Sequence, residues 1–172
     1  MKPLVKTLSN YGYNQKTLLM LIISIGVAIG MSFHGQHDFD VFYISGKRIL
    51  QLESLYRFED GFYCYKYPAL FALLFSPFSL LPLEFAIIIW NLFNVVLLFL
   101  SVHCLIKLLK PSPENTDTIV FSGLLVAAPF IVANFFFRQT NILIMFIVII
   151  SFYNYIYNQK LLSASLLALA IT

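Results

Sequence analysis

Two aspartates and two histidines open a polar stretch that could carry chemistry. This stretch runs from residue 34 to residue 67, and its first part reads HGQHDFDVFYISGKRIL. Asp38 stands just before an apolar stripe at helical spacing, and Asp40 falls in the first turn of that helix. A carboxylate there is favoured as an N-cap or a first-turn charge. A carboxylate at the mouth of a cavity can also act as a general base, so Asp38 has two compatible interpretations.

The same cluster has the ligand types of a metal site. His34, His37, Asp38 and Asp40 offer imidazole and carboxylate groups at spacings that occur in metal sites. Polar residues that follow a hydrophobic segment more often just lie at a membrane surface. We therefore expect no metal and no cofactor, and keep metal binding as the alternative.

A second cluster, FYCYKYP, ends the polar stretch. Lys66 is a cation at the entry of an apolar segment and could bind a lipid phosphate. Tyr67 precedes a proline, which favours an extended backbone. For Tyr63 and Tyr65 we expect an aromatic belt at the level of the lipid headgroups.

A third cluster, FFFRQTN, forms a tight turn between two apolar segments. It places Arg138, Gln139 and Asn141 close together. Arg138 could simply extend to lipid headgroups, or it could neutralise a phosphate leaving group. Asn91 and Asn94, within an apolar segment, are expected to form hydrogen bonds between helices.

The composition shows which elements must position these clusters. Of the 172 residues 60% are apolar or aromatic and 11% are charged, with a net charge of +3 and a mean hydropathy of +0.84. Soluble domains carry about 25% charged residues. The composition excludes a disordered chain and a nucleic-acid-binding domain. We expect an all-α integral membrane protein whose partner is the lipid bilayer, with no nucleic acid.

A single transmembrane domain is expected over residues 1–172. A helix needs about 20 apolar residues to cross a bilayer, which predicts about four full spans and an incomplete fifth. A cleaved signal peptide is the alternative for the first of these. The last run is too short to cross, so we expect the chain to be the N-terminal part of a longer protein. The spans are predicted at 17–33, 84–106, 119–137 and 141–157, with 161–172 as the incomplete helix and 107–118 as a polar turn.

Residues 68–83 decide the topology of everything that follows them. Pro77 and Pro82 interrupt this segment, which favours an interfacial or re-entrant helix over a span. The interfacial arrangement also places more of the basic residues in the cytoplasm, as the positive-inside rule prefers. Residues 34–83 are then an extracytoplasmic loop with interfacial helices in a multi-pass protein of the plasma membrane. The N-terminus is cytoplasmic, and the loop and the Arg138 turn share the outer face.

The order of these clusters resembles glycosyltransferase family 87. This family comprises polytopic enzymes of the GT-C superfamily that use polyprenyl-phosphate sugars. The resemblance covers residues 34–143. It rests on DFDVFYISGKRILQLESLY, then YKYPALFALLFSPFSLLPLEFAIIIWNLFN, then RQTNILI. Glu53-Ser54 stands where a glycine-containing turn is common in the family, and Arg138-Gln139 replaces Gly-Gln.

The resemblance implies a GT-C-like polytopic helical bundle, present here in part because the family is about twice this length. It implies inverting transfer of a hexose, expected to be mannose, from a polyprenyl-phosphate donor to a lipid-linked or envelope glycan, or to a glycolipid. Asp38 would be the general base, with Asp40 as the runner-up. Missing helices would complete the donor cavity, so the chain alone could be inactive. The residues expected to bind the donor phosphate and substrate are Lys66, Tyr67, Arg138, Gln139 and Asn141.

Two other classes of function stay open. One is a multispanning transporter or flippase of lipid-linked sugars, and the other is a non-catalytic membrane scaffold. The expected spans carry no Asp, Glu, Lys or Arg except near their ends. Ion-coupled transporters usually place ionisable groups at membrane depth, so this pattern favours an enzyme.

Overall fold

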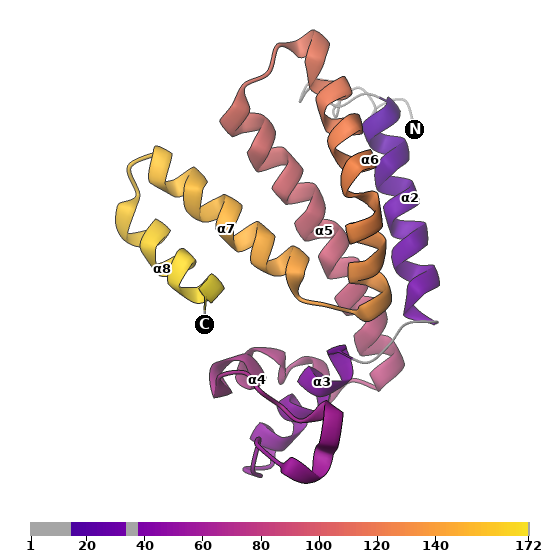
Figure 1. Ribbon diagram of the computed structural model, residues 1–172, viewed down its shortest axis with the longest axis vertical. Coiled ribbons are helices and arrows are strands. Elements are labelled where there is room, and N and C mark those ends of the chain that lie inside the picture. The colour runs from indigo at the N-terminus through magenta and orange to yellow at the C-terminus, as the bar shows by residue number, and fades with distance from the viewer. Residues whose placement is uncertain (1–14, 34–37, 172) are drawn as a thin grey trace.

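The computed structural model describes residues 15–33 and 38–171, and this part of the chain contains helices and loops without a strand (Figure 1). The expectation of an all-helical protein is therefore confirmed. His34 and His37, two members of the hypothetical metal cluster, lie outside the described residues. The elements are α2 (Gln15–Ser32), α3 (Asp38–Leu50), η1 (Phe58–Tyr63), α4 (Ala69–Phe75), η2 (Phe78–Leu80), α5 (Leu83–Leu109), α6 (Pro113–Phe137), α7 (Asn141–Ile156) and α8 (Lys160–Ile171).

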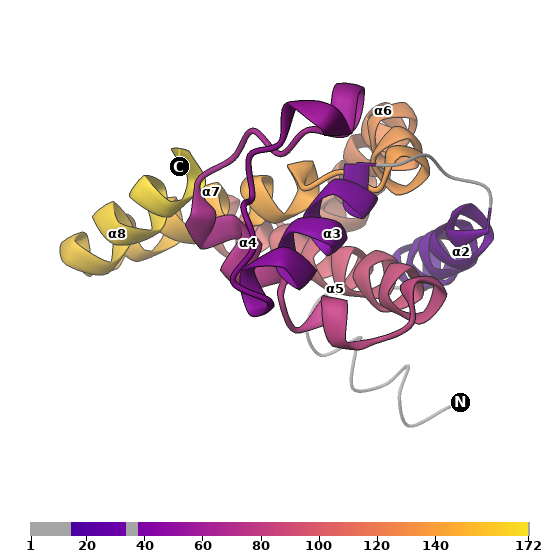
Figure 2. The same ribbon diagram turned by 90° about the horizontal axis from the view of Figure 1, so that it is seen from below.

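Three helices, α2, α5 and α6, form a bundle, and α3 and α4 lie at one end of it (Figures 1 and 2). The connection between α5 and α6 is at the opposite end. The chain turns from α6 into α7 at the end that carries α3 and α4, and α8 folds back along α7. Packing of small and aliphatic side chains, including Ala28, Leu98, Phe135 and Ile142, joins α2, α5, α6 and α7.

Two of the described helices are long and apolar enough to cross a membrane. They are Leu83–Leu109 in α5 and Glu114–Phe137 in α6, and α7 is apolar but shorter. Residues 68–83 form the seven-residue helix α4, which stops before Pro77, and the short turn η2. Seven helical residues rise only about 10 Å, so α4 is far too short to cross a bilayer.

The expected polar turn at 107–118 is wrong in extent. Helix α5 continues to Leu109 and ends with Lys110 in the left-handed conformation. Helix α6 starts at Pro113, with Ser112 as its N-cap and Glu114 in its first turn. Proline at the first helical position and an acidic first turn are both start signals for a helix. Polarity in this segment therefore marks helix ends and not a long loop.

The apolar side of α3 is covered by protein. Phe39 and Phe42 are buried in an aromatic cluster with Phe75 of α4 and Trp90 of α5. The Phe39 and Trp90 rings are stacked at 5.7 Å, and those of Phe42 and Phe75 at 4.7 Å. Such ring pairs add stabilisation beyond the area that they bury. The cluster fixes α3 and α4 on the first turns of α5, so the apolar stripe of α3 packs on protein.

Tyr65 also departs from its expected place. Its side chain is 3% exposed, and its hydroxyl donates to the backbone oxygen of Pro68 at 2.7 Å. Burial raises the pKa of Tyr65 to about 12. The expectation of an aromatic belt at the level of the lipid headgroups was wrong for this residue. Its ring is packed inside residues 38–82, which comprise α3, η1, α4 and η2 and are called the end unit below, and this packing takes it out of reach of lipid.

Asn91 and Asn94 differ in what they join. Nδ2 of Asn91 donates to Oγ of Ser32 at 2.9 Å and to the backbone oxygen of Ala28 at 3.2 Å, both on α2. The expected bond between helices is confirmed for Asn91. Nδ2 of Asn94 instead donates to Trp90 one turn earlier in the same helix. For Asn94 the expectation was wrong, because its amide satisfies a carbonyl of its own helix.

Candidate functional site at the α3 end of the bundle

Asp40 and Arg138, far apart in the sequence, meet at the end of the bundle that carries α3. Nη1 of Arg138 lies 3.5 Å from Oδ1 of Asp40. The side chain of Arg138 is 8% exposed and that of Asp40 is 22% exposed, so the pair is largely removed from water. Opposite charges attract more strongly in such surroundings than in water. The segment that enters α3 and the turn that follows α6 therefore reach one place.

The backbone at Arg138 adopts a conformation that glycine prefers. Arg138 ends α6 with φ 56° and ψ 40°, and its N–H donates to the backbone oxygen of Asn134. The N–H of Gln139 donates to the same oxygen at 3.0 Å. A side chain in this region costs about 1 kcal/mol or more. The resemblance has glycine at this position, and the arginine that stands here adopts a backbone conformation that suits glycine.

Hydrogen bonds connect Arg138 to the inside of the bundle. Its Nη2 donates to the backbone oxygen of Ser32 at 3.2 Å. Ser32 in turn accepts from Asn91, so the last turn of α2 links α5 to the guanidinium. These hydrogen bonds join the last turn of α2 to α5 and to the end of α6. Nε of Arg138 has no hydrogen-bond partner among the described residues, and this donor can serve a ligand.

Amide side chains line the turn beside Arg138. Nδ2 of Asn141 donates to Oε1 of Gln139 at 2.7 Å. Asn134, one turn before Arg138 on α6, is buried. The three amides gather where α6 ends and α7 begins, so this turn offers uncharged hydrogen-bonding groups next to a cation.

Three other predicted residues, Asp38, Lys66 and Tyr67, lie on α3 or in the loop before α4. Asp38 is exposed at the start of α3 and forms no ion pair with the described residues. The ring of Tyr67 packs on Phe42 at 4.9 Å, which places it beside the second turn of α3. Lys66 is exposed next to Tyr67 and takes part in no ion pair within the described part of the chain.

A second ion pair holds the loop between α3 and α4. Nη1 and Nη2 of Arg48 donate to the two carboxylate oxygens of Asp60 at 2.5 and 2.8 Å. These hydrogen bonds hold the pKa of Asp60 below its usual value and that of Arg48 above its usual value. Two parallel bonds between a guanidinium and a carboxylate fix geometry as well as charge. The pair therefore ties η1 to the end of α3.

Among the described residues, no group of three or more His, Cys, Asp or Glu side chains gathers as metal ligands would. Asp38 and Asp40 are the described members of the hypothetical metal cluster. Asp40 is directed to Arg138.

The sequence analysis did not predict two residues of this site, Ser32 and Asn134. Ser32 lies at the end of the first apolar segment, and its backbone oxygen gives no signal in a sequence. Asn134 did give a signal, because it is an amide in an otherwise apolar helix four residues before Arg138. Such an amide within an apolar segment indicates a hydrogen-bonding or ligand-binding position.

The described part of the chain is a helical bundle with charged and amide side chains gathered at one end. A family model described as glycosyltransferase family 87 matches residues 65–172, which is more than half of the chain. The chain belongs to glycosyltransferase family 87, as the resemblance predicted. The match contains Lys66, Tyr67 and the whole Arg138 turn, and it begins after Asp38 and Asp40. Comparisons with curated proteins and with solved structures found no match.

Family membership implies that the protein is a glycosyltransferase, which would use a sugar donor and a glycan acceptor. Together with the two apolar helices of spanning length, it indicates a membrane protein.

Proposed function

We propose that this chain carries the polar face of an inverting membrane hexosyltransferase. The donor is a polyprenyl-phosphate hexose, with mannose as the sugar, and the acceptor is a lipid-linked or envelope glycan. Family membership supports the reaction class. The observation that carries the proposal is the contact between Asp40 and Arg138, since it unites a carboxylate-bearing segment and a cation-bearing turn at one end of the helices.

The proposed topology follows from the same contact. Helices α2, α5, α6 and α7 are proposed to cross the plasma membrane, with α8 as part of a fifth crossing. The end with Asp40 and Arg138 faces outward, and the N-terminus is cytoplasmic. Lys107 and Lys110, where α5 ends, belong to the opposite end of the bundle (Figure 1). Basic residues at that end agree with the positive-inside rule.

Asp38 is proposed as the general base, and Asp40 as a positioning residue. Asp40 is engaged by Arg138, whereas Asp38 is exposed one half-turn earlier on α3. The acceptor hydroxyl gives its proton to the carboxylate of Asp38 as its oxygen attacks the anomeric carbon. The bond from that carbon to the phosphate oxygen breaks, and the electron pair leaves with the phosphate. Displacement from the opposite side inverts the anomeric centre.

The Arg138 turn is proposed to bind the leaving phosphate. Nε of Arg138 has no partner among the described residues, and a donor aimed at developing negative charge lowers a reaction barrier. Lys66 adds a second cation, and Gln139 and Asn141 add hydrogen bonds. Tyr67, a residue that is 45% exposed, offers an aromatic face to the substrate.

Transfer of radiolabelled mannose from its polyprenyl phosphate, measured in the protein's native membranes, tests the proposal. The Asp38→Asn variant is expected to lower the rate by about 10² to 10⁴-fold with normal insertion. Glu59→Gln is the matched control, because Glu59 is an exposed carboxylate in the same end unit. The anomeric configuration of the product should be opposite to that of the donor.

The pH profile separates the two aspartates. Asp38→Asn should remove the acid limb of the rate profile, whereas Asp40→Asn should lower the rate and keep that limb. Unchanged transfer in Asp38→Asn would remove this residue from its role. Movement of the sugar lipid across the membrane without any glycosylated product would contradict the enzyme proposal and favour a transporter.

A further inference from the structure

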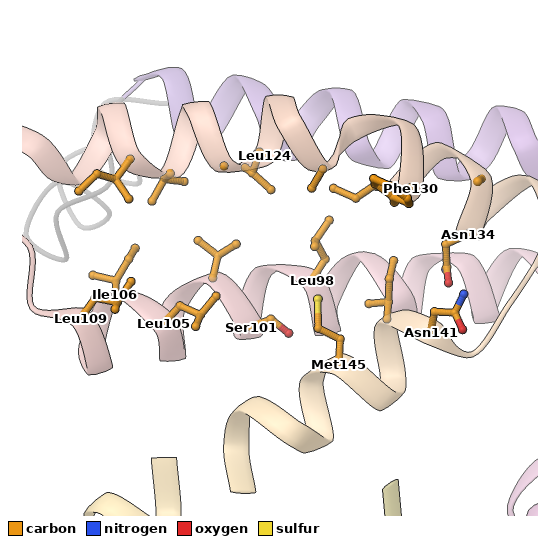
Figure 3. A pocket seen from close by; sticks show the side chains of 18 of the residues that line it. Leu98, Ser101, Leu105, Ile106, Leu109, Leu124, Phe130, Asn134, Asn141 and Met145 are labelled. Atoms are coloured by element: carbon orange, nitrogen blue, oxygen red, sulfur yellow. The ribbon is translucent and has the colours of Figure 1, made fainter. Parts of the chain in front are cut away.

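A cavity of about 520 Å³ lies between α5, α6 and the start of α7 (Figure 3). Ligand pockets commonly have volumes of about 300–1,000 Å³. Apolar side chains form most of its walls, among them Leu98 and Leu105 from α5, Leu124 from α6 and Met145 from α7. The lining runs along α5 from Leu98 to Leu109 and along α6 from Ile119 to Asn134, so the shape of the cavity suits an extended hydrocarbon chain.

One end of this cavity is polar. Asn134, Gln139 and Asn141 line it there, and Figure 3 shows the side chain of Asn134 pointing from α6 toward Asn141. Asn134 is 3% exposed, and neither its Oδ1 nor its Nδ2 has a hydrogen-bond partner among the described residues. A buried amide without partners is unfavourable. Nδ2 of Asn134 can therefore donate a hydrogen bond to a ligand, and its Oδ1 can accept one from the same ligand.

None of the residues that line the cavity is charged. Arg138 lies between Asn134 and Gln139 in the chain, but its guanidinium is directed to Asp40 and Ser32. A phosphate at Asn134 would be buried without a cation from the lining, and an isolated buried charge is costly. An uncharged polar group fits, since an ester carbonyl can accept from Nδ2 and a hydroxyl can donate to Oδ1.

We propose that this cavity is a binding site for an uncharged acylglycerol lipid. One acyl chain lies between α5 and α6, and the ester and hydroxyl groups meet the amide of Asn134. The cavity shares Gln139 and Asn141 with the proposed phosphate-binding turn but does not include Asp40 or Arg138, and lipid binding to it can be measured without the transfer reaction.

A diacylglycerol with a photoreactive diazirine in its acyl chain tests this site. The probe is mixed into phosphatidylcholine nanodiscs that contain the whole chain, and labelled peptides are mapped by mass spectrometry. We expect labels on Leu98, Leu124 and Met145, and unlabelled diacylglycerol should compete with the probe. Polyprenyl phosphate should compete much more weakly than diacylglycerol, because the cavity lining offers no cation to its charged group.

Two variants connect the label to the cavity. Gly123 lines the cavity, and an added Cβ there would meet no atom within 4 Å, so Gly123→Leu should fill the space and abolish the label. Gly26→Leu is the matched control, since Gly26 on α2 has equally open surroundings outside the cavity. Asn134→Leu should weaken competition by diacylglycerol about fivefold, the effect of one hydrogen bond of ordinary strength.

Several results would overturn the proposal. They are equal labelling of Gly123→Leu and the native protein, labels spread over the outer faces of the helices, and competition by polyprenyl phosphate as strong as that by diacylglycerol. The label map of the native protein decides the matter even if a variant does not fold. Because the readout is binding, its failure is distinct from a failure of the transfer assay.

Discussion

Arg138 combines an unfavourable backbone with favourable side-chain contacts. Its left-handed φ would suit glycine, yet its guanidinium contacts Asp40 and Ser32. Unfavourable backbone conformations persist where the surrounding structure compensates for them, and they are frequent at functional sites. The compensation can be measured by comparison with Lys110, which ends α5 in a similar left-handed conformation but has no ion pair like that of Arg138 with Asp40 among the described residues.

Arg138→Gly and Lys110→Gly should therefore have opposite effects. Lys110 ends α5 with φ 46° and ψ 49° and is exposed. Replacing it by glycine relieves the backbone and should stabilise the protein by up to about 1 kcal/mol. Arg138→Gly loses a buried ion pair and leaves Asp40 without its cation, so it should destabilise by about 2–4 kcal/mol in total. Reversible unfolding in mixed micelles measures both changes, and stabilisation by Arg138→Gly would show that the pair contributes nothing.

Asp60 gives the end unit a dependence on pH. Its lowered pKa means that the folded protein holds this carboxylate ionised, so the stabilisation is complete above the ordinary aspartate pKa of about 4. It is lost as the pH falls through the lowered value. The melting temperature of Asp60→Asn should be below that of the native protein at pH 6, and the difference should shrink as the pH falls below about 4. Glu59→Gln should show little difference at either pH, and a constant deficit for Asp60→Asn would contradict the prediction.

At the scale of elements, Gly46 permits the close approach of α3 to the segment after α4. A Cβ on Gly46 would clash with Oγ of Ser79 and lie 3.0 Å from the backbone N and Cα of Ser76. Oγ of Ser79 already donates to the backbone oxygen of Tyr43, so this side chain is not free to move away. The aromatic cluster around Phe39 and Trp90 depends on that approach.

Gly46→Ala should destabilise the end unit by about 1–3 kcal/mol, the usual cost of forcing extra atoms into a packed site. Gly123→Ala is the control, because its added Cβ has open space and alanine favours helix. Tryptophan fluorescence reports on the cluster directly through Trp90. Equal unfolding midpoints for the two variants would mean that α3 is not packed as described.

The helices were largely predictable, and their ends were less so. Long apolar runs predicted α5 and α6, because a stretch of about 20 apolar residues is by itself a signal for a membrane helix. The start of α6 at Pro113 was missed, since its capping signals sit in a polar stretch that also suits a loop. The helix breaks at Pro77 and Pro82 could be predicted, because proline has no backbone N–H to donate and its ring clashes with the preceding helical turn.

At the scale of the whole molecule, the sequence could suggest that two connectors share a face, but not which atoms meet. The contact of Arg138 with Asp40, and not with Asp38, depends on how α3 is rotated by its aromatic cluster. The backbone oxygen of Ser32 and the cavity beside Asn134 arise from packing among α2, α5, α6 and α7. Such features come from distant segments, so no local pattern predicts them.

Side-specific labelling of single cysteines tests the central claim, which is one shared site on one membrane face. In a background without Cys64 and Cys104, Lys66→Cys and Gln139→Cys are exposed to a membrane-impermeant maleimide on intact cells. Both should be labelled from outside, whereas Lys110→Cys should need permeabilised cells. Labelling of Lys66→Cys and Gln139→Cys from opposite sides would contradict the account, because their segments could then form no common site.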